Sequence, residues 1–86
     1  MKYSVYLIVT KTKNKHISYV GYASNLKKRI NHHNAGKGAK FTKGKKWKLI
    51  YSQNYKSKIK AMQEEYKLKK NYKLRKIIKN KYLLNA

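Results

Sequence analysis

The stretch that decides the fold is "YSVYLIVT", residues 3–10, close to the start of the chain. It consists almost entirely of β-branched, aromatic and aliphatic residues, the types that are enriched in β-strands. Apolar side chains occupy both alternating sets of positions, so we expect this strand to be covered on both of its faces. Residues 3–10 therefore predict the central strand of a small sheet.

The rest of the chain predicts two further strands and three helices. Residues 17–22 predict a second strand that pairs back as a hairpin, and a short third strand covers residues 47–52. The expected helices are one capped by Ser24 or Asn25 that runs to about residue 34, one capped by Ser57 that runs to about residue 70, and a last one over residues 73–83. This order predicts an α+β fold, with a three-stranded antiparallel sheet flanked by helices.

Composition limits both the class and the partners of the protein. The length predicts one domain over residues 1–86, with residues 71–86 as a C-terminal helical extension. There is no cysteine for a disulfide or a thiolate metal site, and no apolar run approaches the roughly 20 residues of a membrane span. We therefore expect a cytoplasmic protein without a membrane partner. Its net charge of +22 favours a polyanionic partner, above all nucleic acid.

The acidic residues restrict the possible chemistry. The chain has no aspartate and only two glutamates, Glu64 and Glu65, which point in different directions on a helix. Phosphodiester hydrolysis by two metal ions needs several converging carboxylates, and this sequence does not supply them. Glu64 is expected to pair with lysines on the polar face. Glu65 falls inside an apolar arc, where a carboxylate needs a partner, although an exposed pair with Lys69 is the alternative interpretation.

Arg29 stands out because lysine is the usual cation of this chain, with 22 lysines against two arginines. A guanidinium grips two phosphate oxygens in a fixed geometry, whereas an ammonium is a point charge. Arg29 also precedes His33 by one helical turn, so both edge the same face. Taken by themselves, these two residues are explained more simply as a surface arginine beside a half-buried histidine. Arg75 has no such neighbours and is expected to be solvated.

The motifs taken together resemble the GIY-YIG nuclease family over nearly the full chain. "SVY", residues 4–6, stands where the family has GIY, and "YVG", residues 19–21, stands where it has YIG. "SNLKKRINHHNAGKGAKFT" looks like the family's first helix and the loop after it. "AMQEEYKLK", residues 61–69, is similar to the helix that carries the family's metal-binding glutamate, and the match falls on Glu65. The resemblance implies a GIY-YIG-like α+β domain of the small, stand-alone kind.

The resemblance also implies roles for five residues. Glu65 would hold one divalent cation, Mg²⁺ or Mn²⁺, with waters at its other positions. Arg29 would stabilise charge on the scissile phosphate. Tyr6 would accept or relay the proton of the attacking water, and nearby positive charge is expected to lower its pKa. Tyr19 and His33 would orient water and phosphate.

The implied function is a metal-dependent endonuclease that hydrolyses DNA phosphodiester bonds and leaves a 5′-phosphate, with structure selectivity or weak sequence specificity, as in DNA repair enzymes. Duplex or branched DNA is the expected partner. The loop over residues 35–46 would supply the DNA-binding lysines Lys37, Lys40, Lys43, Lys45 and Lys46. The alternative is a catalytically inactive nucleic-acid-binding module on the same fold, and a structural ribosome-associated protein would also suit the charge. Ser4, in place of the first glycine of the motif, is the departure from the family pattern.

Overall fold

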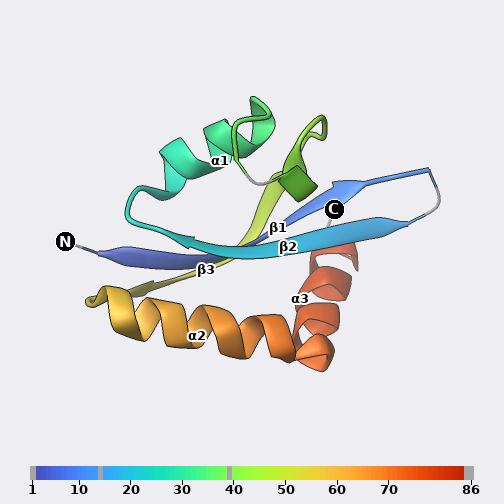
Figure 1. The fold of residues 1–86 in the computed structure, drawn as a ribbon. Helices are drawn as coiled ribbons and strands as arrows, with labels where there is room; N and C mark the ends of the chain where they lie inside the picture. The colour runs from blue at the N-terminus through green and yellow to red at the C-terminus, as the bar shows by residue number, and fades with distance from the viewer. Residues whose placement is uncertain (1, 14, 39, 85–86) are drawn as a thin grey trace.

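The computed structural model describes residues 2–13, 15–38 and 40–84. Within these ranges the chain forms a three-stranded antiparallel sheet, three α-helices and one 3₁₀ turn (Figure 1). The elements, in chain order, are β1 (Tyr3–Lys11), β2 (His16–Ala23), α1 (Leu26–Asn34), η1 (Lys40–Thr42), β3 (Lys48–Tyr55), α2 (Lys58–Lys70) and α3 (Tyr72–Leu84). The predicted α+β class is confirmed. None of the helices in the described ranges is long and apolar enough to cross a lipid bilayer.

Strand β1 occupies the centre of the sheet, as its sequence predicted. The strand order is β2-β1-β3, and both neighbours run antiparallel to β1. Tyr6 faces Gly21 on β2 and Ser52 on β3. The pairing with β3 shifts register between Leu7 and Ile8, which is a β-bulge. Pairing on both sides satisfies the backbone of β1, so this strand can lie in the interior.

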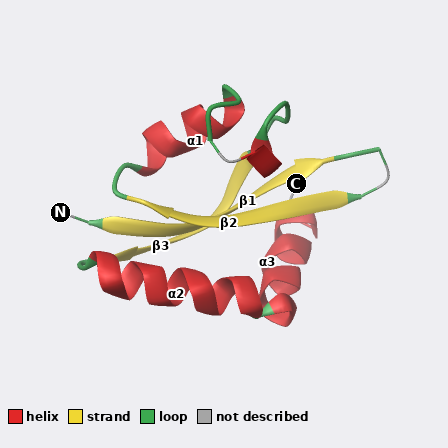
Figure 2. Ribbon diagram, viewed as in Figure 1, coloured by secondary structure: helices red, strands yellow, loops and turns green. Residues whose placement is uncertain are grey.

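Two layers of helices cover the sheet. Helix α1 lies on one face, and α2 and α3 lie on the other (Figure 2). Because side chains alternate along a strand, β1 contributes to both layers. Val5 and Leu7 pack with Leu68 of α2, whereas Tyr6 and Ile8 belong to a second apolar cluster on the α1 face. The central strand therefore connects two small cores.

Side-chain caps begin two of the helices at the positions that the sequence indicated. Asn25 Oδ1 accepts a hydrogen bond from the Lys28 amide at 3.1 Å, and Ser57 Oγ accepts one from the Lys60 amide at 3.0 Å. Each cap satisfies an amide that has no partner within the helix. Of the two predicted candidates for the first cap, Asn25 is therefore the residue that begins α1.

Most elements end within one residue of the prediction, and the larger differences occur in β3 and in the loop before it. Strand β3 continues to Tyr55 instead of ending at Ser52, because β1 offers it pairing partners as far as Tyr3. The polar residues that close β3 have low strand propensity, and the neighbouring strand overrides it. The segment expected to be only a loop contains η1, whose last residue, Thr42, is fully buried. This turn matters for the site described below.

Arg75 is not the solvated residue that the sequence predicted. Its Nε donates to the Leu68 carbonyl oxygen at 3.1 Å, and its Nη2 donates to the Lys69 carbonyl oxygen at 3.1 Å. These oxygens lie at the C-terminal end of α2, where helix carbonyls lack internal partners and a cation is favourable. The turn at Asn71 brings the start of α3 back over that end. Arg75 therefore joins the two helices.

Gly21 is the position of the sheet where we expect a side chain to be tolerated least. A Cβ at this position would overlap the hydroxyl and ring of the buried Tyr6. Replacement of Gly21 by Ala should lower the free energy of unfolding by about 1–3 kcal/mol, as measured by urea denaturation. The cost should shrink in a Tyr6→Leu background, which removes the obstructing ring. Strictly additive effects of the two changes would contradict this explanation.

Candidate active site

A buried chain of three hydrogen-bonded side chains connects the sheet, α1 and η1. The Tyr6 hydroxyl lies 2.8 Å from His33 Nε2, and the Thr42 hydroxyl lies 2.8 Å from His33 Nδ1. Each of the three residues is at most 1% exposed, so bulk water does not reach this chain freely. Three segments that are distant in sequence therefore meet at one imidazole ring, and both of its nitrogens have a partner.

Two glycines make room for this chain. A Cβ at Gly21 would overlap the Tyr6 hydroxyl, and a Cβ at Gly38 would overlap the His33 ring around Nδ1. The backbone can approach both polar side chains closely because glycine lacks that atom. Gly21 belongs to the "YVG" motif, whereas Gly38 stood in the sequence as one of several glycines in a lysine-rich loop.

Thr42 is held in place by the residues on either side of the loop. Its carbonyl oxygen accepts a hydrogen bond from Trp47 Nε1 at 3.0 Å. The Trp47 amide donates to Asn34 Oδ1 at 2.6 Å, which ties the start of β3 to the end of α1. Sequence analysis identified neither Thr42 nor Trp47. The available signal was weak, because a threonine in a loop and a tryptophan at the first position of an expected strand belong to no period that would indicate a buried contact.

His33 is neutral at neutral pH. Burial lowers its pKa below the ordinary value of 6.5, and the charge of Arg29 and then that of His32 act in the same direction. A neutral imidazole has one N–H and one bare nitrogen. Since the hydroxyls of Tyr6 and Thr42 can each donate or accept, either tautomer is satisfied. The hydrogen-bonded side chains of Tyr6, His33 and Thr42 are therefore suited to passing a proton from one to the next.

Tyr6 keeps its proton. Burial raises its pKa well above the ordinary value of 10, the neighbouring Tyr19 adds to that rise, Arg29 opposes it, and Glu65 adds to it again. The charge of Arg29 lowers this pKa as predicted, but burial disfavours the phenolate more strongly, so the pKa of Tyr6 rises overall. Tyr6 is thus suited to relaying a proton and poorly suited to holding a negative charge.

Tyr19 lies between the buried chain and the surface. Its ring meets the His33 ring edge-on, with centroids 5.3 Å apart and planes at 62°. It also stacks on the ring of Phe41 in η1, with centroids 6.1 Å apart and planes at 22°. Tyr19 is half-buried, unlike Tyr6. The structure therefore brings Tyr6, Tyr19 and His33 together on the α1 face.

Arg29 is exposed on α1, one turn before His33, and its charge shifts the pKa of both His33 and Tyr6. A hollow of about 420 Å³ opens beside it. The lining residues are Tyr3, Tyr22, Ala23, Ser24, Arg29 and Lys58. Because Arg29 belongs to α1 and Lys58 begins α2, this hollow lies where the two helical layers approach each other at the end of β2. An anion placed there would meet positive charge from both layers.

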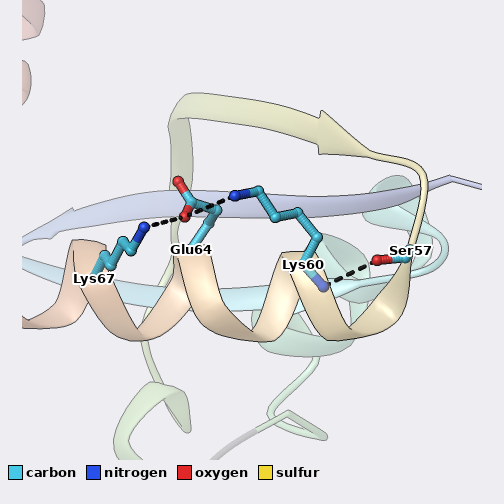
Figure 3. A network of polar contacts seen from close by, with 4 residues as sticks. All are labelled: Ser57, Lys60, Glu64 and Lys67. Atoms are coloured by element: carbon cyan, nitrogen blue, oxygen red, sulfur yellow. Dashed lines mark hydrogen bonds and ion pairs between the residues drawn. The ribbon is translucent and has the colours of Figure 1, made fainter.

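Glu64 forms ion pairs with two neighbouring lysines. Its Oε2 lies 3.0 Å from Lys67 Nζ and 3.7 Å from Lys60 Nζ, and Figure 3 shows the carboxylate between the two ammonium groups. The hydrogen bond from Lys67 is the main reason why the pKa of Glu64 lies below its usual value. The expected pairing of Glu64 with lysines is confirmed, but its position on the polar face is not, because Glu64 lines a hollow together with Val5, Tyr55 and Leu68. The two lysines leave this carboxylate poorly suited to binding a metal.

Glu65 forms an ion pair with one lysine, whereas Glu64 forms ion pairs with two. Its side chain is 18% exposed, and its Oε1 lies 3.5 Å from Lys69 Nζ, so the semi-buried position and the alternative pairing with Lys69 occur together. Helix α2 covers the sheet face opposite α1, yet the charge of Glu65 still raises the pKa of Tyr6.

The chemistry of Glu65 fits one hydrated cation. Mg²⁺ is commonly held by one or two carboxylates and keeps several waters, so Glu65 could be its protein ligand. No cluster of three potential metal-binding side chains occurs among the residues that the structure describes.

The apolar arc predicted around Glu65 exists on one flank only. On the flank expected from Ala61, Leu68 and Tyr72, the first two are buried against the sheet, whereas Tyr72 is 64% exposed. Ile59, Met62 and Tyr66, which were expected to form the other flank, are 45–70% exposed. Helix α2 packs against the sheet with the side that carries Ala61 and Leu68. The described part of α3 does not cover the opposite side of α2. The helical period identified an apolar set, but it could not tell which of its members are covered.

The predicted DNA-binding lysines surround η1. Lys37, Lys40, Lys43 and Lys46 are exposed, and Lys45 is half-buried, with its Nζ 5.7 Å from the ring centroid of Phe41. All five lie between the end of α1 and the start of β3, on the side of the sheet that carries His33. Contact of these lysines with DNA stays a prediction.

Comparison with known proteins places this arrangement in a family. Residues 2–82 match the GIY-YIG catalytic domain. The chain belongs to the GIY-YIG family. Among its relatives, the UPF0213 protein SH2523 of Staphylococcus haemolyticus is 43% identical over 65 residues, which cover 74% of this chain and 78% of that protein. The UPF0213 protein YazA of Bacillus subtilis is 47% identical over 53 residues, which cover 60% of this chain and 54% of YazA.

A solved structure is similar as well. The solution NMR structure of the UPF0213 protein BH0048 from Bacillus halodurans is 31% identical, with a TM-score of 0.47 over 99% of this chain and 84% of that one. The chain spans little more than half the length of several curated relatives, YazA among them.

The two GIY-YIG motifs lie side by side in the sheet. Residue Tyr6 of "SVY" faces Gly21 of "YVG" across β1 and β2. Ser4, which departs from the GIY-YIG pattern, donates from its hydroxyl to Asn54 Oδ1 of β3 at 2.6 Å. The serine therefore makes a contact between β1 and β3 that a glycine could not make, and the position of Tyr6 is retained.

We expect His33 to make the stability of this GIY-YIG domain fall in acid. Below about pH 6.5 the unfolded chain protonates this histidine, while the folded chain resists protonation because its pKa is lowered. The free energy of unfolding should therefore decrease as the pH falls from about 6.5 toward the folded-state pKa, and then level off. Urea denaturation of wild type and His33→Gln between pH 7.5 and 5 measures this slope.

The glutamine variant should have the flatter profile, because it has no imidazole to protonate. His16→Gln is the matched control, since His16 begins β2 and takes no part in the Tyr6–His33–Thr42 hydrogen bonds. Equal slopes for wild type and His33→Gln would show that the buried imidazole does not set the acid sensitivity.

Proposed function

We propose that this protein is a metal-dependent endonuclease that hydrolyses DNA phosphodiester bonds and leaves a 5′-phosphate, with structure selectivity or weak sequence specificity. One observation carries the proposal: the buried Tyr6–His33–Thr42 chain, with the charge of Arg29 acting on both Tyr6 and His33. A polar chain of this kind costs stability unless every member has a partner, and a binding module does not require it. The net charge of +22 supports a polyanionic substrate.

The proton path follows from the protonation states. The attacking water gives its proton to the Tyr6 oxygen, and Tyr6 passes its own proton to His33 Nε2. This step uses the tautomer in which Nδ1–H of His33 donates to Thr42. Because burial lowers the pKa of His33, the ring does not keep the proton. His33 returns it through Tyr6 to solvent, and the departing 3′ oxygen takes up a proton from solvent, so the relay is reset after each turnover. Tyr19, the half-buried tyrosine beside His33, orients the water at the surface of the nearly buried Tyr6.

Arg29 and Glu65 supply charge in this proposal. The Arg29 guanidinium donates to the phosphate oxygens as negative charge builds up on them in the transition state. Glu65 would hold Mg²⁺ or Mn²⁺, and such an ion supplies Lewis-acid charge for the departing 3′ oxygen when it is bound. Lys69 is flexible and half-exposed, so it can release the carboxylate.

The second candidate is an inactive nucleic-acid-binding module. It is favoured by the pairing of Glu65 with Lys69 and by the location of α2 on the sheet face opposite His33. The two functions separate in one assay. Single-stranded, duplex, flap and branched DNA are incubated with the protein in Mg²⁺ and in EDTA, and both cleavage and binding are measured.

We expect cleavage in Mg²⁺, its loss in EDTA, and binding in both. The Glu65→Gln variant should lose cleavage by about 10²-fold or more, since an amide is a poor Mg²⁺ ligand compared with a carboxylate. The matched control is Glu64→Gln, which should cut at close to the wild-type rate because Glu64 is held by Lys60 and Lys67. Binding without cleavage of any substrate would favour the inactive module.

Arg29→Lys should also be severely impaired, although it leaves the net charge unchanged. Loss of a preset donor to a developing oxyanion typically reduces the rate about 10²–10³-fold, and lysine lacks the rigid fork of donors. Single-turnover cleavage, with a binding titration at matched salt, measures the effect. Non-specific binding should barely change, because it depends on charge.

Arg75→Lys is the control for arginine chemistry in general. It should lower stability by removing hydrogen bonds to the end of α2, while cleavage of the folded fraction stays near normal. Near-normal cleavage by Arg29→Lys would mean that this position supplies only charge.

A further inference from the structure

Phe41 is an exposed aromatic residue at the rim of the site, and the proton path gives it no role. It is the single phenylalanine of the chain and is 51% exposed, although it lies in η1 between the buried Thr42 and a lysine. Isolated exposed apolar residues are common and need no explanation. Phe41 differs from them because its position is held by neighbours and because it belongs to a series of rings that leads to His33.

The backbone next to the Phe41 ring is held in place by hydrogen bonds and burial of the following residue. The next residue, Thr42, is fully buried, hydrogen-bonded to His33 through its side chain, and hydrogen-bonded to Trp47 through its carbonyl oxygen. Phe41 itself stacks on Tyr19, and Tyr19 meets His33 edge-on. A planar group placed on Phe41 would therefore lie two ring contacts from the buried chain.

The surroundings of Phe41 are cationic. Lys45 Nζ lies 5.7 Å from the ring centroid and donates to the Phe41 carbonyl oxygen at 3.3 Å. Lys37, Lys40, Lys43 and Lys46 complete the basic segment. An exposed ring among ammonium groups matches what a single nucleotide offers, namely a flat base joined to a phosphate. Base–aromatic stacking and backbone neutralisation are the two components of single-strand binding.

We propose that Phe41 is a stacking platform for an unpaired base of the DNA substrate, so that the site selects single-stranded or locally unpaired DNA over intact duplex. The proposal deepens the proposed function and rests on it, since it names the substrate form of the same site. Bases inside a duplex are already stacked on both sides, so a protein ring can stack only on a base that has left the helix. Phe41 then acts as a specificity residue, and the lysines supply affinity that is independent of base pairing.

The test uses three ligands with equal numbers of phosphates per strand: a single-stranded oligonucleotide, the same length of abasic deoxyribose-phosphate spacer, and the matched duplex. Binding is measured in EDTA, so no cleavage is required. Wild type should bind the base-bearing strand about 5- to 100-fold more tightly than the spacer, in line with the usual strength of one stacking contact. Phe41→Leu should bring that ratio close to one and leave spacer binding nearly unchanged, while Phe41→Trp should preserve the ratio.

Tyr72→Leu is the matched control. Tyr72 is 64% exposed and has the Arg75 guanidinium carbon 5.7 Å from its ring centroid, so it repeats the ring-and-cation arrangement of Phe41 on the opposite face of the sheet. This change should leave the ratio at the wild-type value. Circular dichroism and thermal unfolding establish that each variant is folded.

The outcomes separate this inference from the proposed function. A base-to-spacer ratio that Phe41→Leu does not alter, or a preference for duplex over single strand, would overturn the stacking proposal even if the protein cuts DNA. A Phe41-dependent ratio without cleavage of any substrate would uphold stacking and count against the endonuclease.

Discussion

A buried imidazole needs a hydrogen-bond partner at each nitrogen. At His33, this requirement fixes how β1, α1 and η1 are placed relative to one another. The strand supplies the Tyr6 hydroxyl, and the turn η1 supplies the Thr42 hydroxyl. Leaving either nitrogen unpaired would cost about 1–3 kcal/mol, which is a large share of the stability of a small domain. The strand, α1 and η1 are therefore held in one mutual position, and Gly21 and Gly38 are needed because no Cβ fits beside the buried pair.

The electrostatics of the chain are divided between a neutral interior and a strongly positive surface. Burial keeps both His33 and Tyr6 uncharged, while the charge of Arg29 favours the neutral form of His33 and opposes the neutral form of Tyr6 without overcoming burial. The only two carboxylates of side chains lie on α2 and contact lysines. A net charge of +22 therefore finds little compensation within the molecule, and an external polyanion is its natural counterpart.

The sheet separates the two halves of the proposed site. Tyr6, Tyr19 and His33 lie on the α1 face, while Glu65 comes from α2 on the other face. The two helical layers approach each other at the end of β2, where Arg29 of α1 and Lys58 of α2 line one hollow. In the proposed function, phosphodiester hydrolysis would use one carboxylate, one guanidinium and a neutral proton relay. This division explains why helical phase alone was a poor guide to the surroundings of Glu65.

The sequence by itself determined the α+β class, the central position of β1, the cap at Ser57, and the residues that match the GIY-YIG pattern, whereas it left Ser24 and Asn25 as equal candidates for the first cap. These features depend on local periodicity and on short motifs, which a sequence contains directly. The tertiary structure alone decided the rise in the pKa of Tyr6, the roles of Thr42 and Gly38, the contacts of Arg75, and which flank of α2 is covered. Each of these depends on burial by segments distant in the chain, as Tyr6 and His33 are 27 residues apart. Desolvation and close contact are properties of the packed molecule, so no local pattern could have predicted their sign or their partners.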